Sequence, residues 1–345
     1  MQKSKIKIYL VFVIVLFVCV LFFSLKNDFK DILHSLYNVN YIWLLFGIVF
    51  VFLSKCLIGL TTFELGKKEN KKISMSKMQQ IALIYHFYAG ITPSAIGGEA
   101  FEIFYLKQSG ISLGGASNIT MQKFILYEIA LIIVNTVAVI INFFTHIVVD
   151  SSFVGSAITL NFIVNFVMLG GCFLITYNKW VKNFILQKGV FFLNKIKIIK
   201  DVNKSRNKID EFMVNFDEGA KSLRSDRHLL WKIGVYNIFS LFFLMIAAWP
   251  IARAMHITNI SFINLFILAT YAKMMCSLIV TPGASGAAEY CFIYLFTGLI
   301  EENDIMPYML IWRFATYYVP LVVGGILALS WERRKVHEET TSSKS

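Results

Sequence analysis

The sequence predicts an all-α fold: a polytopic bundle of transmembrane helices with six full spans and two broken, re-entrant helical regions that form an inverted repeat. Three observations predict this fold. The 345-residue chain is 57% hydrophobic and only 16% charged, whereas soluble domains contain about 25% charged residues. Its apolar residues gather into blocks of about 20 residues, the length at which an α-helix crosses the hydrocarbon layer of a membrane. Two apolar regions carry proline and glycine in their middle.

Six uninterrupted apolar blocks are each long enough to cross a membrane. They are residues 8–25, 41–62, 124–149, 153–177, 233–252 and 308–329. The first block follows a basic N-terminal segment, as the hydrophobic region of a secretory signal peptide does, but it is not followed by the small residues of a cleavage site. We therefore interpret it as a retained span.

The two interrupted regions are residues 78–106 and 262–300. In the first, arms of residues 78–92 and 97–106 are too short to span alone, and proline ends a helix. This region is therefore predicted to be a re-entrant hairpin. The second region has longer arms, which suit either a hairpin or two tilted spans.

The distribution of lysine and arginine predicts how the chain is oriented. Nearly all of these residues outside the apolar blocks fall in segments 67–77, 107–117, 178–232 and the tail after Trp331. Because positively charged loops stay in the cytoplasm, we expect a multi-pass protein of the cell membrane with both termini cytoplasmic. Residues 1–335 are expected to form one transmembrane domain. Within it, residues 178–232 form a basic amphipathic linker that rests on anionic lipid, and residues 336–345 form a disordered tail.

The two interrupted regions contain an internal repeat. From Thr92 the sequence reads TPSAIGGEAFEIFYL, and from Thr281 it reads TPGASGAAEYCFIYL. The identical pairs are Thr92/Thr281, Pro93/Pro282, Ala95/Ala284, Gly97/Gly286, Tyr105/Tyr294 and Leu106/Leu295. Three predicted spans separate the copies, and an odd number requires the copies to enter from opposite faces. Inverted repeats with broken helices are typical of alternating-access transporters, which place their site at the repeat interface.

The hairpin turns have a predicted chemistry. Proline stops the first arm, glycine permits the turn, and the second arm begins with free N–H groups at the positive end of its dipole. Helix N-termini that converge in this way suit an anion such as phosphate. The residues predicted to make these turns are Pro93, Gly97, Gly98, Pro282, Gly283 and Gly286. The alternative is that the breaks only bend helices for packing.

Ionisable residues inside a membrane cost about 2.5–3.5 kcal/mol each at a helix centre, so those present require a reason. Glu99 and Glu289 each follow a predicted turn and could contact a cationic head group or a coupled proton, or merely cap a helix. Glu102 lies one turn after Glu99, and two like charges at this spacing raise each other's pKa. Lys273 could neutralise Glu289 or hold a phosphate. Arg313 is either a phosphate clamp or an anchor that reaches the membrane surface.

Four other polar residues, in or beside the apolar regions, are interpreted as structural. Lys55 and Glu128 lie near predicted cytoplasmic ends and are expected to extend toward the membrane surface. Lys123 is expected at that surface itself. His86 is expected to be a packed histidine.

Several classes of function lack their usual signature in this sequence. The five cysteines lie in apolar blocks without a CxxC pair, so we interpret them as core residues and expect no metal. Motifs for nucleotide binding, metalloproteases and serine hydrolases are missing, and we expect no cofactor. The net charge of +12 is concentrated beside apolar blocks, which indicates lipid head groups and no nucleic acid.

Three motifs together resemble the lysylphosphatidylglycerol synthase transmembrane-region family, also called flippase-like. They are the TPSAIGGE run at 92–99, the TPGASGAAE run at 281–289 and the WRFATYYVP run at 312–320. In bacterial multiple peptide resistance factors of this kind, the membrane region moves aminoacylated phosphatidylglycerol to the outer leaflet and blunts attack by cationic peptides. The resemblance implies that Glu99, Glu289 and Arg313 are polar residues of a head-group path.

This sequence differs from the full synthases of the family that it resembles. Those synthases have a large soluble C-terminal domain that takes lysine from lysyl-tRNA. Only fourteen residues follow Trp331 here, too few for a folded domain. The sequence therefore predicts a stand-alone flippase or transporter for an anionic, aminoacylated or other polar phospholipid. The alternatives are a phosphatidylglycerol lysyltransferase and a membrane scaffold, and the candidate protein partners are a second copy of the chain and a separate synthase.

Overall fold

The computed structural model describes residues 34, 37–92, 96–148, 151–182, 184, 202–279 and 287–342. Within this part of the chain the named elements are all helices, and five are long and apolar enough to cross a membrane. These five are α3 (Tyr41–Glu69), α6 (Leu113–Thr145), α7 (Ser152–Tyr177), α10 with α11 (Arg227–Ala254) and the continuous stretch Glu302–Arg334. The predicted helical membrane fold is thus confirmed. The predicted first span, residues 8–25, lies outside the described residues.

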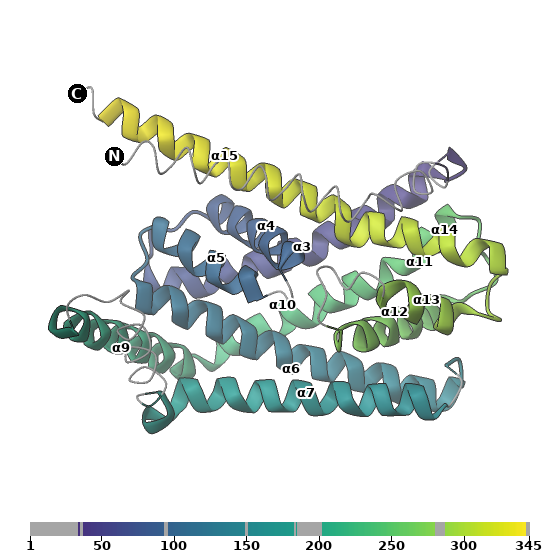
Figure 1. Cartoon of the computed structure of the whole chain (residues 1–345), viewed down its shortest axis with the longest axis horizontal. Coiled ribbons are helices and arrows are strands. Elements are labelled where there is room, and N and C mark those ends of the chain that lie inside the picture. The colour runs from purple at the N-terminus through teal and green to yellow at the C-terminus, as the bar shows by residue number, and fades with distance from the viewer. Residues whose placement is uncertain are drawn as a thin grey trace.

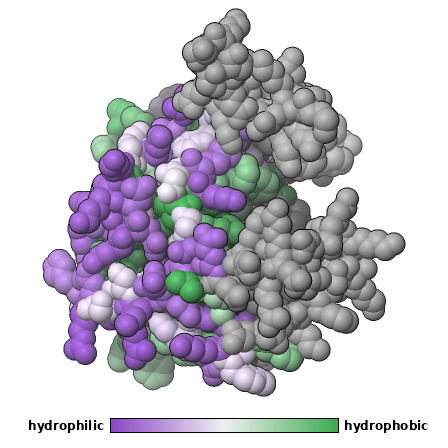
Figure 2. Space-filling view, turned by 90° about the vertical axis from the view of Figure 1, so that its left-hand side faces the viewer, coloured by the Kyte–Doolittle hydropathy of each residue, from purple (hydrophilic) through white to green (hydrophobic). Residues whose placement is uncertain are grey.

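The long helices lie side by side along the longest axis of the molecule (Figure 1). Helix α9 (Val202–Ser225) lies at one end, and α11 (Ala248–Ala254) lies toward the other. We call these the α9 end and the α11 end. Figure 2 looks onto the α9 end and shows hydrophilic residues over most of its described surface. This is the end that carries the basic segments predicted to be cytoplasmic.

Two helical hairpins enter the bundle from opposite ends (Figure 1). Helices α4 (Met75–Ile91) and α5 (Ile96–Gln108) pack together at the α9 end. Helices α12 (Phe262–Cys276) and α13 (Ala287–Phe296) pack together toward the α11 end. Each arm falls short of the roughly 20 residues that a span requires. The second interrupted region is therefore a pair of short arms and not two full spans.

Several of the long helices extend beyond their predicted ends. Helix α3 continues past Thr62 to Glu69, and α6 begins at Leu113 instead of Phe124. The last long helix begins at Glu302 instead of Tyr308. Ser112 caps α6 by accepting a hydrogen bond from the Gly115 N–H at 3.0 Å, a local signal that fixes a helix start. As a consequence, polar residues assigned to helix ends lie deep in the bundle.

Helix α9 forms much of the predicted linker and packs across α6. Phe216, Ala220 and Leu223 of its apolar face are buried. A Cβ atom at Gly114 of α6 would lie 2.5 Å from the carbonyl oxygen of Phe212, so glycine is required for this close crossing. Residues 185–201 of the linker lie outside the described part of the chain. The linker also ends earlier than predicted, because α10 (Arg227–Ile246) begins at Arg227.

The C-terminal helix differs from the predicted tail. Helix α15 (Val319–Ser342) continues well past Trp331, whereas the sequence predicted disorder from residue 336. The Trp331 indole N–H donates to Gln108 at 3.0 Å, and Arg334 donates to Gln80 at 2.7 Å. Residues 332–339 contain no glycine or proline to stop the helix, and these two bonds hold its start against the first hairpin.

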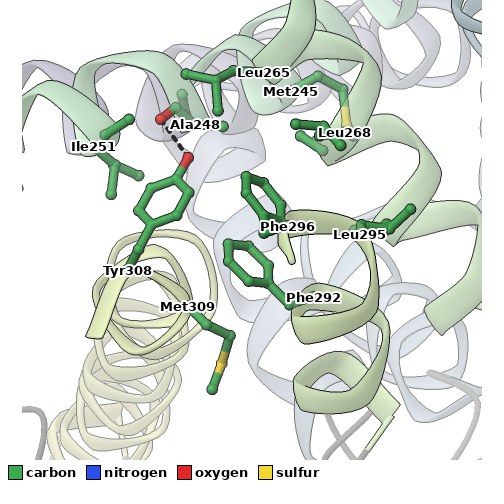
Figure 3. Close-up of a cluster of buried hydrophobic side chains, with 14 of the residues drawn as sticks. Met245, Ala248, Ile251, Leu265, Leu268, Phe292, Leu295, Phe296, Tyr308 and Met309 are labelled. Atoms are coloured by element: carbon green, nitrogen blue, oxygen red, sulfur yellow. Dashed lines mark hydrogen bonds between the residues drawn. The ribbon is translucent and has the colours of Figure 1, made fainter. Parts of the chain in front are cut away.

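The described part of the bundle has a separate hydrophobic cluster in each half, one around each hairpin. The cluster toward the α9 end is formed mainly by α4, α5 and the adjoining parts of α3, α6 and α15. The cluster toward the α11 end includes Phe292 and Phe296, whose rings stack with centroids 4.1 Å apart. Tyr308 packs against both and donates its hydroxyl to the Ala248 carbonyl at 2.8 Å (Figure 3). Polar groups between the clusters are the candidates for function.

Candidate functional site in a central cavity

A cavity of about 290 Å³ lies between the two hairpins and the long helices α3, α6 and α10. The first hairpin contributes Tyr85, His86, Ala89 and Glu99, and the second contributes Lys273. The long helices contribute Ser54, Lys55, Ile58, Thr120, Lys123, Phe124, Tyr127, Ser240, Leu241 and Leu244. Both hairpins therefore contribute ionisable side chains to one chamber inside a membrane protein.

The tip of the first hairpin is held by a threonine. Helix α4 ends beside Thr92, whose hydroxyl donates to the Tyr88 carbonyl at 2.8 Å. The same oxygen accepts a hydrogen bond from the Gly97 N–H at 3.0 Å. One side chain thus satisfies a free carbonyl of the first arm and a free N–H of the second, groups that helix ends leave without partners.

Gly97 and Gly98 lie in the first turn of α5, not in the turn between the arms where the sequence placed them. A Cβ atom on Gly97 would lie 2.4 Å from the Thr92 methyl, and one on Gly98 would lie 2.7 Å from the Tyr85 ring. The two glycines allow the two arms of the hairpin to pack closely together. Pro93, the other residue predicted to make this turn, lies outside the described residues.

Glu99 is held at the cavity wall by a tyrosine of the facing arm. The Tyr85 hydroxyl donates to the Glu99 Oε1 atom at 2.9 Å. Glu99 lies in the first turn of α5, where the helix dipole favours a negative charge. The Glu99 side chain lines the cavity and is only partly buried.

Glu102, one turn further along α5, forms a buried ion pair with Lys123 of α6. The Lys123 ammonium also lies 4.2 Å from the centroid of the Tyr85 ring. Lys123 is buried, so the prediction that it lies at the membrane surface is wrong. The ammonium offsets the repulsion expected between Glu99 and Glu102. The sequence could not indicate this partner because α6 begins earlier than its apolar block.

Two further lysines, Lys55 and Lys273, face the cavity from α3 and α12. Lys55 sits at the middle of the 29-residue α3 and is only 9% exposed. The prediction that it reaches the membrane surface is therefore wrong. Glu128 of α6, assigned the same behaviour, is also buried. The two ammonium groups are close enough to repel each other.

Neutral polar groups complete the wall. The Ser54 and Ser240 hydroxyls lie 3.0 Å apart and join α3 to α10. The His86 Nε2 atom and the Thr120 hydroxyl are buried without a hydrogen-bond partner in the described part of the chain. Polar atoms in such positions usually have partners in native structures. The wall therefore offers hydrogen-bonding groups to an occupant of the cavity.

The first arm of the second hairpin is anchored by an asparagine that the sequence analysis did not single out. Asn161 of α7 donates to the Met274 carbonyl at 3.2 Å and to the Ser277 hydroxyl at 2.8 Å. These groups surround the end of α12, where helical carbonyls lose their partners. Pro282, Gly283 and Gly286 lie outside the described residues. Glu289 lies in α13, but its side chain is outside the described part.

Arg313 is buried at the C-terminal end of α14 (Glu302–Arg313), the first part of the last long helix, and it is not among the residues that line the cavity. The Arg313 Cζ atom lies 5.6 Å from the centroid of the Tyr317 ring and 5.7 Å from the centroid of the Tyr318 ring. The helix widens to a π-helix at η3 (Phe314–Tyr318), where the Val319 N–H bonds the Phe314 carbonyl. Pro320 follows and cannot donate its own helical bond. Burial rules out the predicted alternative of an anchor at the membrane surface.

The fold and the cavity define a class of protein: a multi-pass helical membrane protein in which two short hairpins from opposite ends meet a chamber that contains ionisable side chains. Comparison with known proteins agrees with this class. The sequence profile of the lysylphosphatidylglycerol synthase TM region matches residues 8–324. The chain belongs to this family. It is also 24% identical over 264 residues to a UPF0104 membrane protein of Archaeoglobus fulgidus, covering 74% of this chain and 76% of that protein.

Proposed function

We propose that this protein moves a polar lipid between the two leaflets of the membrane. The observation that carries the proposal is the cavity between the two hairpins, because both Glu99 and Lys273 line it. Sites at the junction of broken helices near the middle of the membrane are typical of alternating-access transporters. Ionisable residues at that depth mark substrate pathways.

The chemistry of the wall suits a lipid head group. Lys55 and Lys273 are basic, Glu99 is acidic, and Ser54, Ser240 and Thr120 are neutral hydrogen-bonding groups. An aminoacylated phospholipid, which carries both a phosphate and an ammonium group, matches the two kinds of charge. The family supports the same substrate class. In the membrane, the acyl chains would remain among lipids while the head group passes through the chamber.

Lipid movement in reconstituted vesicles tests the proposal. Vesicles containing the purified protein and a fluorescent aminoacylated phospholipid are treated with an impermeant quencher, which reads the fraction of lipid that reaches the outer leaflet. We expect the wild-type protein to speed this exchange and Glu99→Gln to slow it at least tenfold. Glu211→Gln, on the exposed surface of α9, is the matched control and should transport normally. Equal rates with and without protein would refute the proposal.

A further inference from the structure

Lys55 is a buried and Lys273 a half-buried basic group of the cavity wall, and neither forms an ion pair within the described part of the chain. Lys55 forms no hydrogen bond or ion pair with the residues that the structure describes, although it is only 9% exposed. Lys273 likewise lacks an ion pair in this part of the chain. Among the described residues, Glu128 interacts electrostatically with Lys273, but the two form no ion pair and Glu128 does not line the cavity.

An isolated ammonium group in a low-dielectric interior is costly unless it is paired. Two ammonium groups that repel each other raise this cost. The third cavity lysine shows the contrast, because Lys123 is paired with Glu102. Within the described residues, one cavity lysine is thus paired internally, and the other two face the chamber without an ion pair.

We propose that Lys55 and Lys273 form a binding site for a phosphate group, which enters the cavity as part of its ligand. The assignment of the phosphate to a lipid head group rests on the proposed function. A phosphate placed between α3 and α12 would pair with both ammonium groups at once. The unpartnered His86 Nε2 atom and Thr120 hydroxyl line the same cavity, so they can contribute hydrogen bonds. Charge-assisted bonds of this kind are the stronger class in proteins.

The site also predicts an unusual effect on stability. If Lys55 is reserved for a ligand, Lys55→Met removes an unpaired buried charge and should raise the thermal stability of the ligand-free protein. A lysine with a structural partner would give the opposite sign, because its removal leaves the partner alone. Lys123→Met supplies this contrast and should lower the stability. A fall in stability for Lys55→Met would overturn the proposal.

Binding is measured directly with purified full-length protein in detergent. The probes are short-chain phosphatidylglycerol, diacylglycerol with the same chains but no phosphate, and inorganic phosphate. We expect Lys55→Gln and Lys273→Gln each to weaken phosphatidylglycerol binding about 10- to 100-fold, as the loss of one charge-assisted bond predicts. Diacylglycerol binding should stay unchanged. Lys67→Gln, at an exposed position of α3, is the matched control.

The probes separate the two sources of phosphate. Lysine-dependent binding of phosphatidylglycerol supports a lipid ligand, and lysine-dependent binding of inorganic phosphate alone supports a soluble one. Equal affinity of the wild type and both lysine variants for every phosphate probe would overturn the site. The transport assay is independent of this result. Lysine-dependent phosphate binding without lipid movement would support the phosphate site and refute lipid transport. Normal lipid transport by the double variant Lys55→Gln/Lys273→Gln would support lipid transport and refute the phosphate site.

Discussion

Lys123 is the residue whose surroundings differ most from its expected place. It was expected at the membrane surface, yet it is buried, pairs with Glu102 and lies over the Tyr85 ring. Tyr85 in turn donates to Glu99. The carboxylate that faces the cavity is thus connected through Tyr85 and Lys123 to a second, fully covered carboxylate. This chain of contacts fixes the first hairpin against α6.

Breaking the buried pair should destabilise the fold. Lys123→Met leaves Glu102 buried without its cation and should lower the free energy of unfolding by roughly 3–5 kcal/mol. The double variant Lys123→Met/Glu102→Leu removes both charges and should lose much less, because no unpaired charge remains. Denaturant unfolding in detergent measures both. A double variant as unstable as the single one would contradict this account of the pair.

At the residue scale, the sequence identified which ionisable residues line the cavity better than it identified the residues they contact. The cost of placing ionisable groups in a membrane singled out Glu99 and Lys273, and both line the cavity. It assigned Lys55 to the membrane surface and not to the cavity, because the apolar block that contains Lys55 ends at residue 62 while the helix ends at Glu69. The carboxylate partner of Lys123 depends on the crossing of α5 and α6, which no local pattern encodes.

At the scale of elements, the first hairpin is pressed against α15 through glycine. A Cβ atom on Gly324 would lie 2.4 Å from the Leu83 carbonyl oxygen and 2.9 Å from the Phe87 Cβ atom. The Tyr317 hydroxyl also donates to the Gly90 carbonyl at 3.1 Å. Small residues of this kind let membrane helices approach closely. The position of α4, and with it the cavity wall, depends on this contact.

Substitution of Gly324 tests this contact. Gly324→Ala should force α4 and α15 apart and lower the free energy of unfolding by about 1–3 kcal/mol, the usual effect of overpacking. Gly234→Ala is the matched control, because a Cβ atom there meets no atom within 4 Å. It should be neutral, or stabilising by up to about 1 kcal/mol, since alanine favours a helix over glycine. Equal effects of the two substitutions would show that α4 and α15 do not require the close approach.

The interrupted regions show what an element-scale pattern can and cannot predict. Proline and glycine in the middle of an apolar block predicted broken helices, and the structure has short arms in both regions. The pattern did not reveal the separate roles of Thr92, which joins the arms, and of Gly97 and Gly98, which let them approach. Those roles depend on atoms from the facing arm.

At the scale of the whole molecule, the ends of the bundle differ in charge. The α9 end carries Lys67, Lys68, Arg227 and Arg334 together with much of the linker. Lys68 contacts Asp226 at 2.5 Å, and this bond lowers the pKa of the Asp226 carboxyl below its usual value. At the α11 end, Arg253 lies over the Trp249 ring. The positive-inside rule therefore predicts that the α9 end faces the cytoplasm.

Cysteine labelling in intact cells tests this orientation. Ser225→Cys lies at an exposed site of the α9 end, and Thr258→Cys lies at an exposed site beyond α11. A membrane-impermeant maleimide should label the second variant and spare the first until the cells are permeabilised. The parent protein, with its own cysteines, supplies the background. The reverse pattern would invert the predicted topology and the direction assigned to each hairpin.

The sequence by itself determined the helical membrane fold, five of its spans as the structure describes them, and the places where two apolar regions break. These features follow from local properties: the length of an apolar run, and the inability of proline to continue a helix. Only the tertiary structure decided which charges share the cavity. The depth of Lys55, Lys123 and Glu128 depends on where α3 and α6 end and on which helices cover them. Packing between distant segments sets both, so hydropathy along the chain could not reveal them.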